Sequence, residues 1–210
     1  MTDATLRLLL ARHGETTLNS AHRIIGSTDL PLSNAGRQQA DRLARRLALE
    51  RLDALYASPL RRAVETAELV AAACGLPAQV DERLRETDFG AWEGLSMDEV
   101  ARRDAAALAA WQADAMAAPT GGEPPARLLA RVDALLSDLR GRHAGQTVAL
   151  VAHGGLFQAL ILRALNLPYR NDWVFMLYNG SLSELSLAAV RNVAVYLNDS
   201  AHLGPVNALA

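Results

Sequence analysis

The sequence lacks the features that define several large classes of protein. It contains a single cysteine, Cys74, so an internal disulfide framework is excluded, and this composition suits a reducing compartment. No apolar run reaches the roughly 18 residues that a membrane span needs. The N-terminus carries Asp3 and lacks the basic start and apolar core of a signal peptide. We therefore expect a cytoplasmic protein without a membrane partner.

The charge balance gives no indication of a polyanionic partner. A net charge of −2 offers no basis for binding nucleic acid or an anionic membrane. The chain has 210 residues, of which 50% are hydrophobic and 21% are charged, as in ordinary globular proteins. Because we find no repeat and no linker that would divide the chain, we expect residues 1–210 to form a single domain.

Short apolar strands alternate with amphipathic helices along the chain. Near-continuous apolar runs predict strands at 5–11, 54–57 and 147–152, and alternation over 181–197 predicts a final hairpin. Helices are predicted to begin after an N-cap at Ser33 and after Ser58 with Pro59, and to cover 125–140 and 156–165. This order predicts an α/β fold with three αβα layers and a mostly parallel central sheet.

The segment of about 96–125 is expected to be a small helical lid insertion. Ser96 and Glu99 form a capping box, and the stretch that follows is rich in alanine. It also carries Trp111 and Met116, and it ends in the glycine- and proline-rich loop 119–125. This composition suggests a pocket wall that tolerates apolar ester groups.

Two apolar strands that are far apart in the chain each end in a His-Gly pair. One runs into Arg12, His13 and Gly14, and the other runs into His153 and two glycines. Ligands bind outside the carboxyl ends of strands in open α/β sheets, so the two junctions predict one site. A neutral imidazole can act as a nucleophile, and Gly14 is expected to leave room for a substrate to approach it. Taken alone, the Arg-His-Gly corner is equally consistent with a capped strand end.

Arg62 lies in the first turn of a predicted helix, where the helix dipole disfavours a cation. A bound anion would explain its position. Together with Arg12 and His153, it would form a cationic cup suited to a phosphoryl group.

Five segments resemble the histidine phosphatase superfamily, in its phosphoglycerate mutase-like branch and of the broad-specificity phosphatase type. They follow the family order over most of the first 155 residues: ARHGETTLN (11–19), GSTDLPLSNAGRQQA (26–40), SPLRRAVETA (58–67), LRETDFGAWEG (84–94) and VAHGG (151–155).

The resemblance implies a role for each matched residue. His13 would attack phosphorus and become a phosphohistidine. The phosphoryl oxygens would be held by Arg12, Asn19, Arg62 and His153.

Glu86 would protonate the leaving oxygen and then activate water, so it would have to hold a proton near neutral pH. Without the resemblance, Glu86 would be taken for an exposed loop acid. No metal and no cofactor is implied, and His22, His143 and His202 are scattered.

The leading function is a metal-independent phosphomonoesterase that acts through a phosphohistidine on a small phosphorylated metabolite. Cobalamin-fragment and sugar bisphosphate phosphatases share the motifs. One alternative is a cofactor-dependent phosphoglycerate mutase, although the short insertion and brief tail favour water as acceptor. Another is a non-catalytic scaffold that binds phosphorylated ligands. The sequence leaves open whether the protein forms a homodimer. Leu18, Ile25 and the stretch Gly122-Glu123-Pro124 depart from the common family pattern, which leaves the substrate open.

Overall fold

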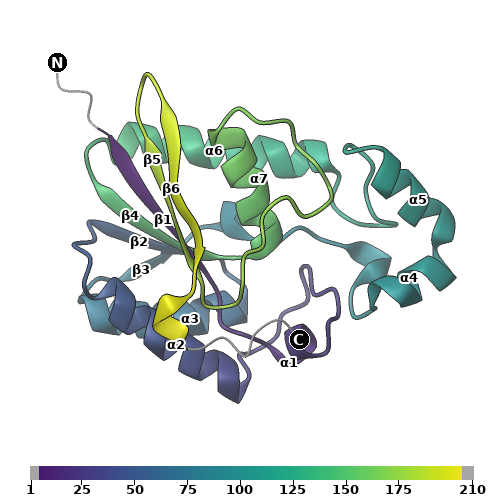
Figure 1. The fold of residues 1–210 in the computed structure, drawn as a ribbon, viewed down its shortest axis with the longest axis horizontal. Helices are drawn as coiled ribbons and strands as arrows, with labels where there is room; N and C mark the ends of the chain where they lie inside the picture. The colour runs from purple at the N-terminus through teal and green to yellow at the C-terminus, as the bar shows by residue number, and fades with distance from the viewer. Residues whose placement is uncertain (1–4, 205–210) are drawn as a thin grey trace.

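The computed structural model describes residues 5–204, in which a six-stranded sheet lies between two layers of helices (Figure 1). Helices α2 (Asn34–Leu47) and α3 (Arg61–Cys74) cover one face of the sheet. Helices α6 (Pro125–Arg142) and α7 (Gly154–Ala164) cover the other. The predicted three-layer αβα architecture is confirmed. Asp3, on which the expectation about a signal peptide rests, lies outside the described residues.

The sheet has the strand order β3-β2-β4-β1-β5-β6. Its strands are β1 (Leu6–Arg12), β2 (Ala54–Ala57), β3 (Ala78–Val80), β4 (Thr147–Ala152), β5 (Leu182–Leu187) and β6 (Asn192–Asp199). The first four strands in the order run parallel, whereas β5 is antiparallel to both β1 and β6. The sheet is therefore mixed but mostly parallel, with the predicted hairpin at one edge and β3, which was not predicted, at the other.

Strand β1 shows why its sequence is apolar without alternation. Leu8 and Leu10 pack with α6 and α7 in one core, and Leu9 and Ala11 pack with α2 and α3 in a second core. Since successive side chains of a strand point to opposite faces, a strand covered on both faces must be apolar throughout.

Helix α3 begins later than the sequence predicts. Its N-cap is Leu60, not Ser58, and Leu60 makes no capping hydrogen bond with its side chain. Asp29 takes over this function, because its Oδ1 accepts a hydrogen bond from the backbone N–H of Arg61 at 2.6 Å. A loop residue thus ties the start of α3 to residues near the N-terminal strand.

The predicted lid segment contains two helices, α4 (Met97–Arg103) and α5 (Ala105–Ala113), in place of one continuous stretch. They extend to one side of the three layers (Figure 1). The helical stretch is interrupted at Asp104, between α4 and α5. The carboxylate of Asp104 accepts hydrogen bonds from Trp92 Nε1 at 2.8 Å and from Thr120 Oγ1 at 2.7 Å. The capping box at Ser96 is present as predicted.

The remaining elements are short. They are α1 (Thr17–Ser20) and the 3-10 helices η1 (Glu82–Leu84), η2 (Gly90–Trp92) and η3 (Ala201–Leu203). Within residues 5–204, no helix combines the length and apolar character needed to cross a membrane.

Candidate active site

The register of the sheet brings the two His-Gly junctions together. Arg12 at the end of β1 pairs with Ala152 at the end of the parallel strand β4. The backbone N–H of His13 donates to the carbonyl of Ala152 at 2.9 Å. As a result, the ring centroids of His13 and His153 lie 5.0 Å apart, so both histidines belong to one site.

Both ring nitrogens of His13 have a hydrogen-bond partner. Its Nδ1 lies 2.7 Å from the carbonyl oxygen of Gly14, and since a carbonyl can only accept, Nδ1 carries the proton. Nε2 then keeps its lone pair and faces the Nε of Arg62 at 3.3 Å. Burial lowers the pKa of His13 well below its usual value, and the nearby charges of Arg62 and Arg12 act in the same direction. The imidazole is therefore neutral, with its lone pair on Nε2.

Arg62 is almost completely buried beside His13. Its Nη1 and Nη2 donate to the carbonyl oxygens of Thr28 and Gly26, each at 2.7 Å. Burial lowers the pKa of this guanidinium, and the charge of Glu86 opposes that shift. These two carbonyls fix the plane of the guanidinium and direct its Nε to His13.

The loop that holds Arg62 depends in turn on Glu93. The Oε1 of Glu93 accepts from the N–H of Ser27 at 2.6 Å, and its Oε2 accepts from the N–H of Thr28 at 2.8 Å. A Cβ on Gly26 would lie 2.1 Å from Oε1 of Glu93, so only glycine fits there. The segment 84–94 was matched in the sequence, but no role was predicted for its Glu93.

Ser58 contacts the second histidine instead of capping α3. Strand β2 ends next to β4, and the N–H of Ser58 donates to the carbonyl of Val151 at 3.0 Å. Its Oγ lies 2.7 Å from Nε2 of His153. Burial lowers the pKa of His153 well below its usual value, and the charge of Arg62 adds to this shift. The other nitrogen, Nδ1, is buried and has no hydrogen-bond partner in the described part of the chain.

Arg12 also keeps a buried donor without a protein partner. Its Nη1 donates to the carbonyl of Leu177, whereas its Nε has no partner among residues 5–204. Burial lowers the pKa of Arg12 to about 10, against an opposing effect of Glu86. Arg12 nevertheless stays charged at neutral pH. Since buried polar atoms are normally satisfied, the unpaired Nε of Arg12 and the unpaired Nδ1 of His153 indicate a site for a ligand.

Asn19 lies at the edge of the same site, where its Oδ1 is already occupied. This oxygen accepts from the N–H of Thr16 at 3.0 Å in a capping box and from Nδ2 of Asn179 at 3.4 Å. Asn179, which the sequence analysis missed, also donates from Nδ2 to the carbonyl of His13 at 3.1 Å. It lies 166 positions from His13, so no local pattern could have revealed it.

Gly14 is glycine for a different reason than the one predicted. A Cβ at this position would lie 2.2 Å from the carbonyl oxygen of Gly36. The requirement is thus the close approach of two backbone segments at the start of α2, and not access of a substrate to the imidazole.

Glu86 rests on the N-terminus of α7. Its Oε2 accepts from the N–H of Gly155 at 3.0 Å, and its Oε1 accepts from the N–H groups of Leu156 and Thr87, each at 2.9 Å. A Cβ on Gly155 would lie 2.8 Å from Oε1. These contacts hold the carboxylate of Glu86 against the first turn of α7.

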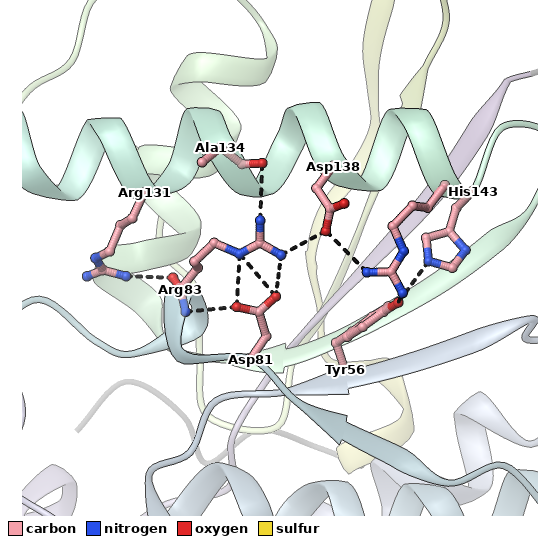
Figure 2. A network of polar contacts seen from close by, with 8 residues as sticks. Tyr56, Asp81, Arg83, Arg131, Ala134, Asp138 and His143 are labelled. Atoms are coloured by element: carbon pink, nitrogen blue, oxygen red, sulfur yellow. Dashed lines mark hydrogen bonds and ion pairs between the residues drawn. The ribbon is translucent and has the colours of Figure 1, made fainter.

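Arg131 of α6 binds the backbone of the segment that carries Glu86. Nη1 of Arg131 donates to the carbonyls of Arg83 and Arg85, both at 2.7 Å, and the same guanidinium forms a double hydrogen bond with Glu123 at 2.9 and 2.8 Å. Figure 2 shows Arg131 at the carbonyl of Arg83, whose own guanidinium bridges Asp81 and Asp138.

The same network continues along α6 to β2 (Figure 2). Arg142 joins Asp138 to the hydroxyl of Tyr56, which also contacts Nε2 of His143 at 2.9 Å. These hydrogen bonds give His143 a structural role.

A cavity of about 260 Å³ opens beside His13 and Arg62. Arg12, His13, Asn19, Arg62 and Glu86 all line it. Its other walls include Trp111 from the predicted lid and Trp173 from the long connection between α7 and β5. Met116 is half-exposed and is not among the lining residues, so its predicted place in the wall is wrong, whereas Met97 does line the cavity.

Metal-ligating side chains do not cluster in the described residues: no group of three or more His, Cys, Asp or Glu is placed to hold an ion.

Comparisons with known proteins agree with this geometry. The profile of the histidine phosphatase superfamily (branch 1) matches residues 8–200. Phosphoserine phosphatase 1 of Hydrogenobacter thermophilus is 34% identical over 200 residues, which are 95% of this chain and 95% of that protein.

Two solved structures are similar over nearly their full length. A mycobacterial glucosyl-3-phosphoglycerate phosphatase in complex with VO3 has a TM-score of 0.84 and 36% identity, with coverage of 92% of this chain and 99% of that one. The α-ribazole phosphatase of Shigella flexneri has a TM-score of 0.82 and 31% identity, with coverage of 92% and 96%.

Proposed function

Because the chain belongs to the histidine phosphatase superfamily and is a phosphoric monoester hydrolase, we propose that His13 is its nucleophile and that it acts on a small phosphorylated metabolite. The observation that carries the proposal is the fixed ring of His13. Its Nδ1 proton is held by a carbonyl, and its Nε2 lone pair lies beside the buried Arg62.

In the first step, the lone pair of Nε2 forms a bond to phosphorus while the bond from phosphorus to the leaving oxygen breaks. Glu86 delivers the proton that the leaving oxygen takes up. The ring gains positive charge on phosphorylation, and the Nδ1–H···O=C bond to Gly14 stabilises it.

In the second step, water attacks phosphorus, the phosphorus–Nε2 bond breaks, and Glu86 takes the proton of the water. Negative charge on the phosphoryl oxygens is neutralised in both steps by Arg12 and Arg62. We expect the unpaired Nε of Arg12 and Nδ2 of Asn19, both at the cavity, to donate to these oxygens, and we propose that the buried His153, whose Nδ1 is unpaired, holds them as well.

The finer features of the proposal follow the sequence. We propose that residues 1–210 act as one domain, with 96–125 as a lid, and that the enzyme is cytoplasmic and needs neither metal nor cofactor. We also propose that the enzyme forms a homodimer.

The test is covalent labelling. Wild-type protein mixed briefly with ³²P-labelled p-nitrophenyl phosphate and quenched in alkali should carry acid-labile, base-stable phosphate. His13→Ala should lose this label and nearly all turnover, whereas His143→Gln, in the network of Figure 2, should keep both. Label retained on His13→Ala would refute the nucleophile, and rapid isomerisation of 3-phosphoglycerate would instead identify a mutase.

A further inference from the structure

The walls of the cavity beyond the phosphoryl site are largely apolar. Six lining residues form a surface that we call the apolar wall: Ile24, Phe89, Met97, Trp111, Tyr169 and Trp173. They come from four separate parts of the chain. Trp173 lies near Arg12, because a Cβ on Gly154 would meet both its ring at 3.1 Å and the guanidinium carbon of Arg12 at 3.5 Å.

The side-chain amide of Gln158, which also lines the cavity, is committed to protein partners. Gln158 donates from Nε2 to the carbonyls of Arg170 and Asp172 and accepts from the N–H of Val174 at 2.9 Å. Its amide is thus used in shaping the loop that carries Trp173. It offers little to the hydroxyl groups of a sugar.

The charged lining residues outside the phosphoryl site are already paired. Glu123 is bound twice by Arg131, and Arg23 donates from Nη1 to Glu99 at 2.7 Å and to the carbonyl of Gly94 at 2.6 Å. A second anionic group on a substrate, such as a carboxylate or a second phosphate, would therefore meet at Arg23 a guanidinium whose charge is already balanced by Glu99.

The apolar wall is also held in place before any ligand binds. Nδ2 of Asn171 donates to the carbonyls of Trp111, Asp114 and Ala117 at 3.0, 2.9 and 3.3 Å. These bonds tie the loop of Trp173 to the end of α5. The ring of Trp111 in turn packs edge-on against the buried Trp92, with centroids 5.7 Å apart. A preformed apolar surface binds a ring without paying much ordering entropy.

We infer that the site selects phosphate monoesters whose leaving group is uncharged, apolar and about the size of one or two rings. The inference rests on the proposed function, since it concerns the leaving side of the same reaction. The cavity volume of about 260 Å³ agrees with a compact ligand, because small-molecule pockets usually begin at roughly 300 Å³.

A substrate panel tests the inference. Benzyl phosphate, phosphoserine, glycerol 3-phosphate and 3-phosphoglycerate are all esters of primary alcohols, so differences in kcat/KM report binding of the leaving group more than its chemistry. Burial of a phenyl ring predicts a preference for benzyl phosphate of about ten- to a hundredfold. Equal or higher kcat/KM for phosphoserine or 3-phosphoglycerate would overturn the inference.

Variants then locate the preference. Trp173→Ala should reduce the ratio of kcat/KM for benzyl phosphate to that for glycerol 3-phosphate by about tenfold, and Trp173→Phe should retain most of it. Trp173 is 54% exposed, so neither variant should prevent folding. Met116→Ala, in the lid segment but outside the cavity, should leave the ratio unchanged. A ratio that Trp173→Ala leaves intact would refute the role of the wall.

The two proposals fail in different ways. If wild-type protein forms no phosphohistidine, the proposed function fails. If it forms the phosphohistidine and hydrolyses all four esters without preference, only the inference about the leaving group fails.

Discussion

Arg131→Met should separate the placement of Glu86 from the rest of catalysis. The guanidinium of Arg131 binds the carbonyls of Arg83 and Arg85 and pairs with Glu123, so it fixes the backbone immediately before Glu86. The side chains of Arg131 and Glu123 are only 15% and 9% exposed. Methionine keeps much of the length of the side chain and removes every donor.

The cost in stability follows from the burial of the pair. Removing one partner of a buried ion pair costs about 3–5 kcal/mol, and the slight exposure of Arg131 favours the lower end, about 3 kcal/mol. For a chain of 210 residues this corresponds to a fall in Tm of about 6–12 °C. Arg163→Met is the matched control, because it breaks a double hydrogen bond from α7 to Asp133, which lies on α6 as Arg131 does. The side chains of Arg163 and Asp133 are 43% and 47% exposed. An exposed pair is worth about 1 kcal/mol or less, so the control should lose little.

The activity should fall in a way that depends on the leaving group. Glu86 keeps its backbone donors at α7 in the variant, so its function is impaired but not removed. A general acid contributes about 10²–10⁴-fold, and we therefore expect kcat/KM to fall about 10- to 100-fold for benzyl phosphate. For p-nitrophenyl phosphate, whose leaving group needs no proton, the loss should stay within about threefold. The assay compares kcat/KM, because this constant reports the step in which the leaving group departs.

A second variant shows whether stability alone explains the result. Arg131→Met with Glu123→Leu removes the stranded carboxylate, so it should recover part of the lost Tm without recovering kcat/KM for benzyl phosphate. Equal losses on the two esters, or full recovery of activity in the double variant, would refute the positioning role of Arg131.

Three further outcomes are expected. Gly155→Ala should reduce kcat/KM for benzyl phosphate more than for p-nitrophenyl phosphate, since its Cβ would lie 2.8 Å from Oε1 of Glu86; equal kcat/KM values to wild type would contradict the tight approach. The pKa values of His13 and His153 are lowered by burial in the folded protein, so the unfolded chain binds protons that the native state does not, and chemical denaturation should show stability falling as the pH drops below about 6.5. Asparagine at both positions should flatten this dependence, and an unchanged slope would assign it to other groups. Excess EDTA should leave turnover of p-nitrophenyl phosphate intact, and strong inhibition that added metal reverses would show that the reaction needs an ion.

The parts of the site that lie at strand ends could be placed from the sequence. Parallel strands end at a common edge, so His13 and His153 were expected together, and the register of Arg12 with Ala152 brings them there. The position of Arg62 in the first turn of a helix, which is unfavourable for a cation, correctly indicated an unusual environment. Each of these predictions used only local pattern and sheet geometry.

Residues whose function depends on distant partners could not be placed in this way. Ser58 before Pro59 is an ordinary helix start, and nothing local indicates that its hydroxyl contacts a histidine 95 positions away. Asn179 and Arg131 show the same limit, because side-chain packing determines their partners. Gly14 is a related case: a missing side chain shows that space is needed but not which neighbour occupies it.

Glu86 differs from the other site residues in how its position is fixed. The histidines are held by the hydrogen-bond register of the sheet, which few single substitutions can shift. Glu86 belongs to a connection without such a register, and it depends on Arg131 on one side and on the N-terminus of α7 on the other. Without Glu86, the N–H groups at the N-terminus of α7 could have bound the phosphoryl group, as helix N-termini commonly do. Since the carboxylate takes them, the proposed binding of the phosphoryl oxygens would depend more heavily on Arg12 and Arg62, and the burial of these two arginines near His13 supports that proposal.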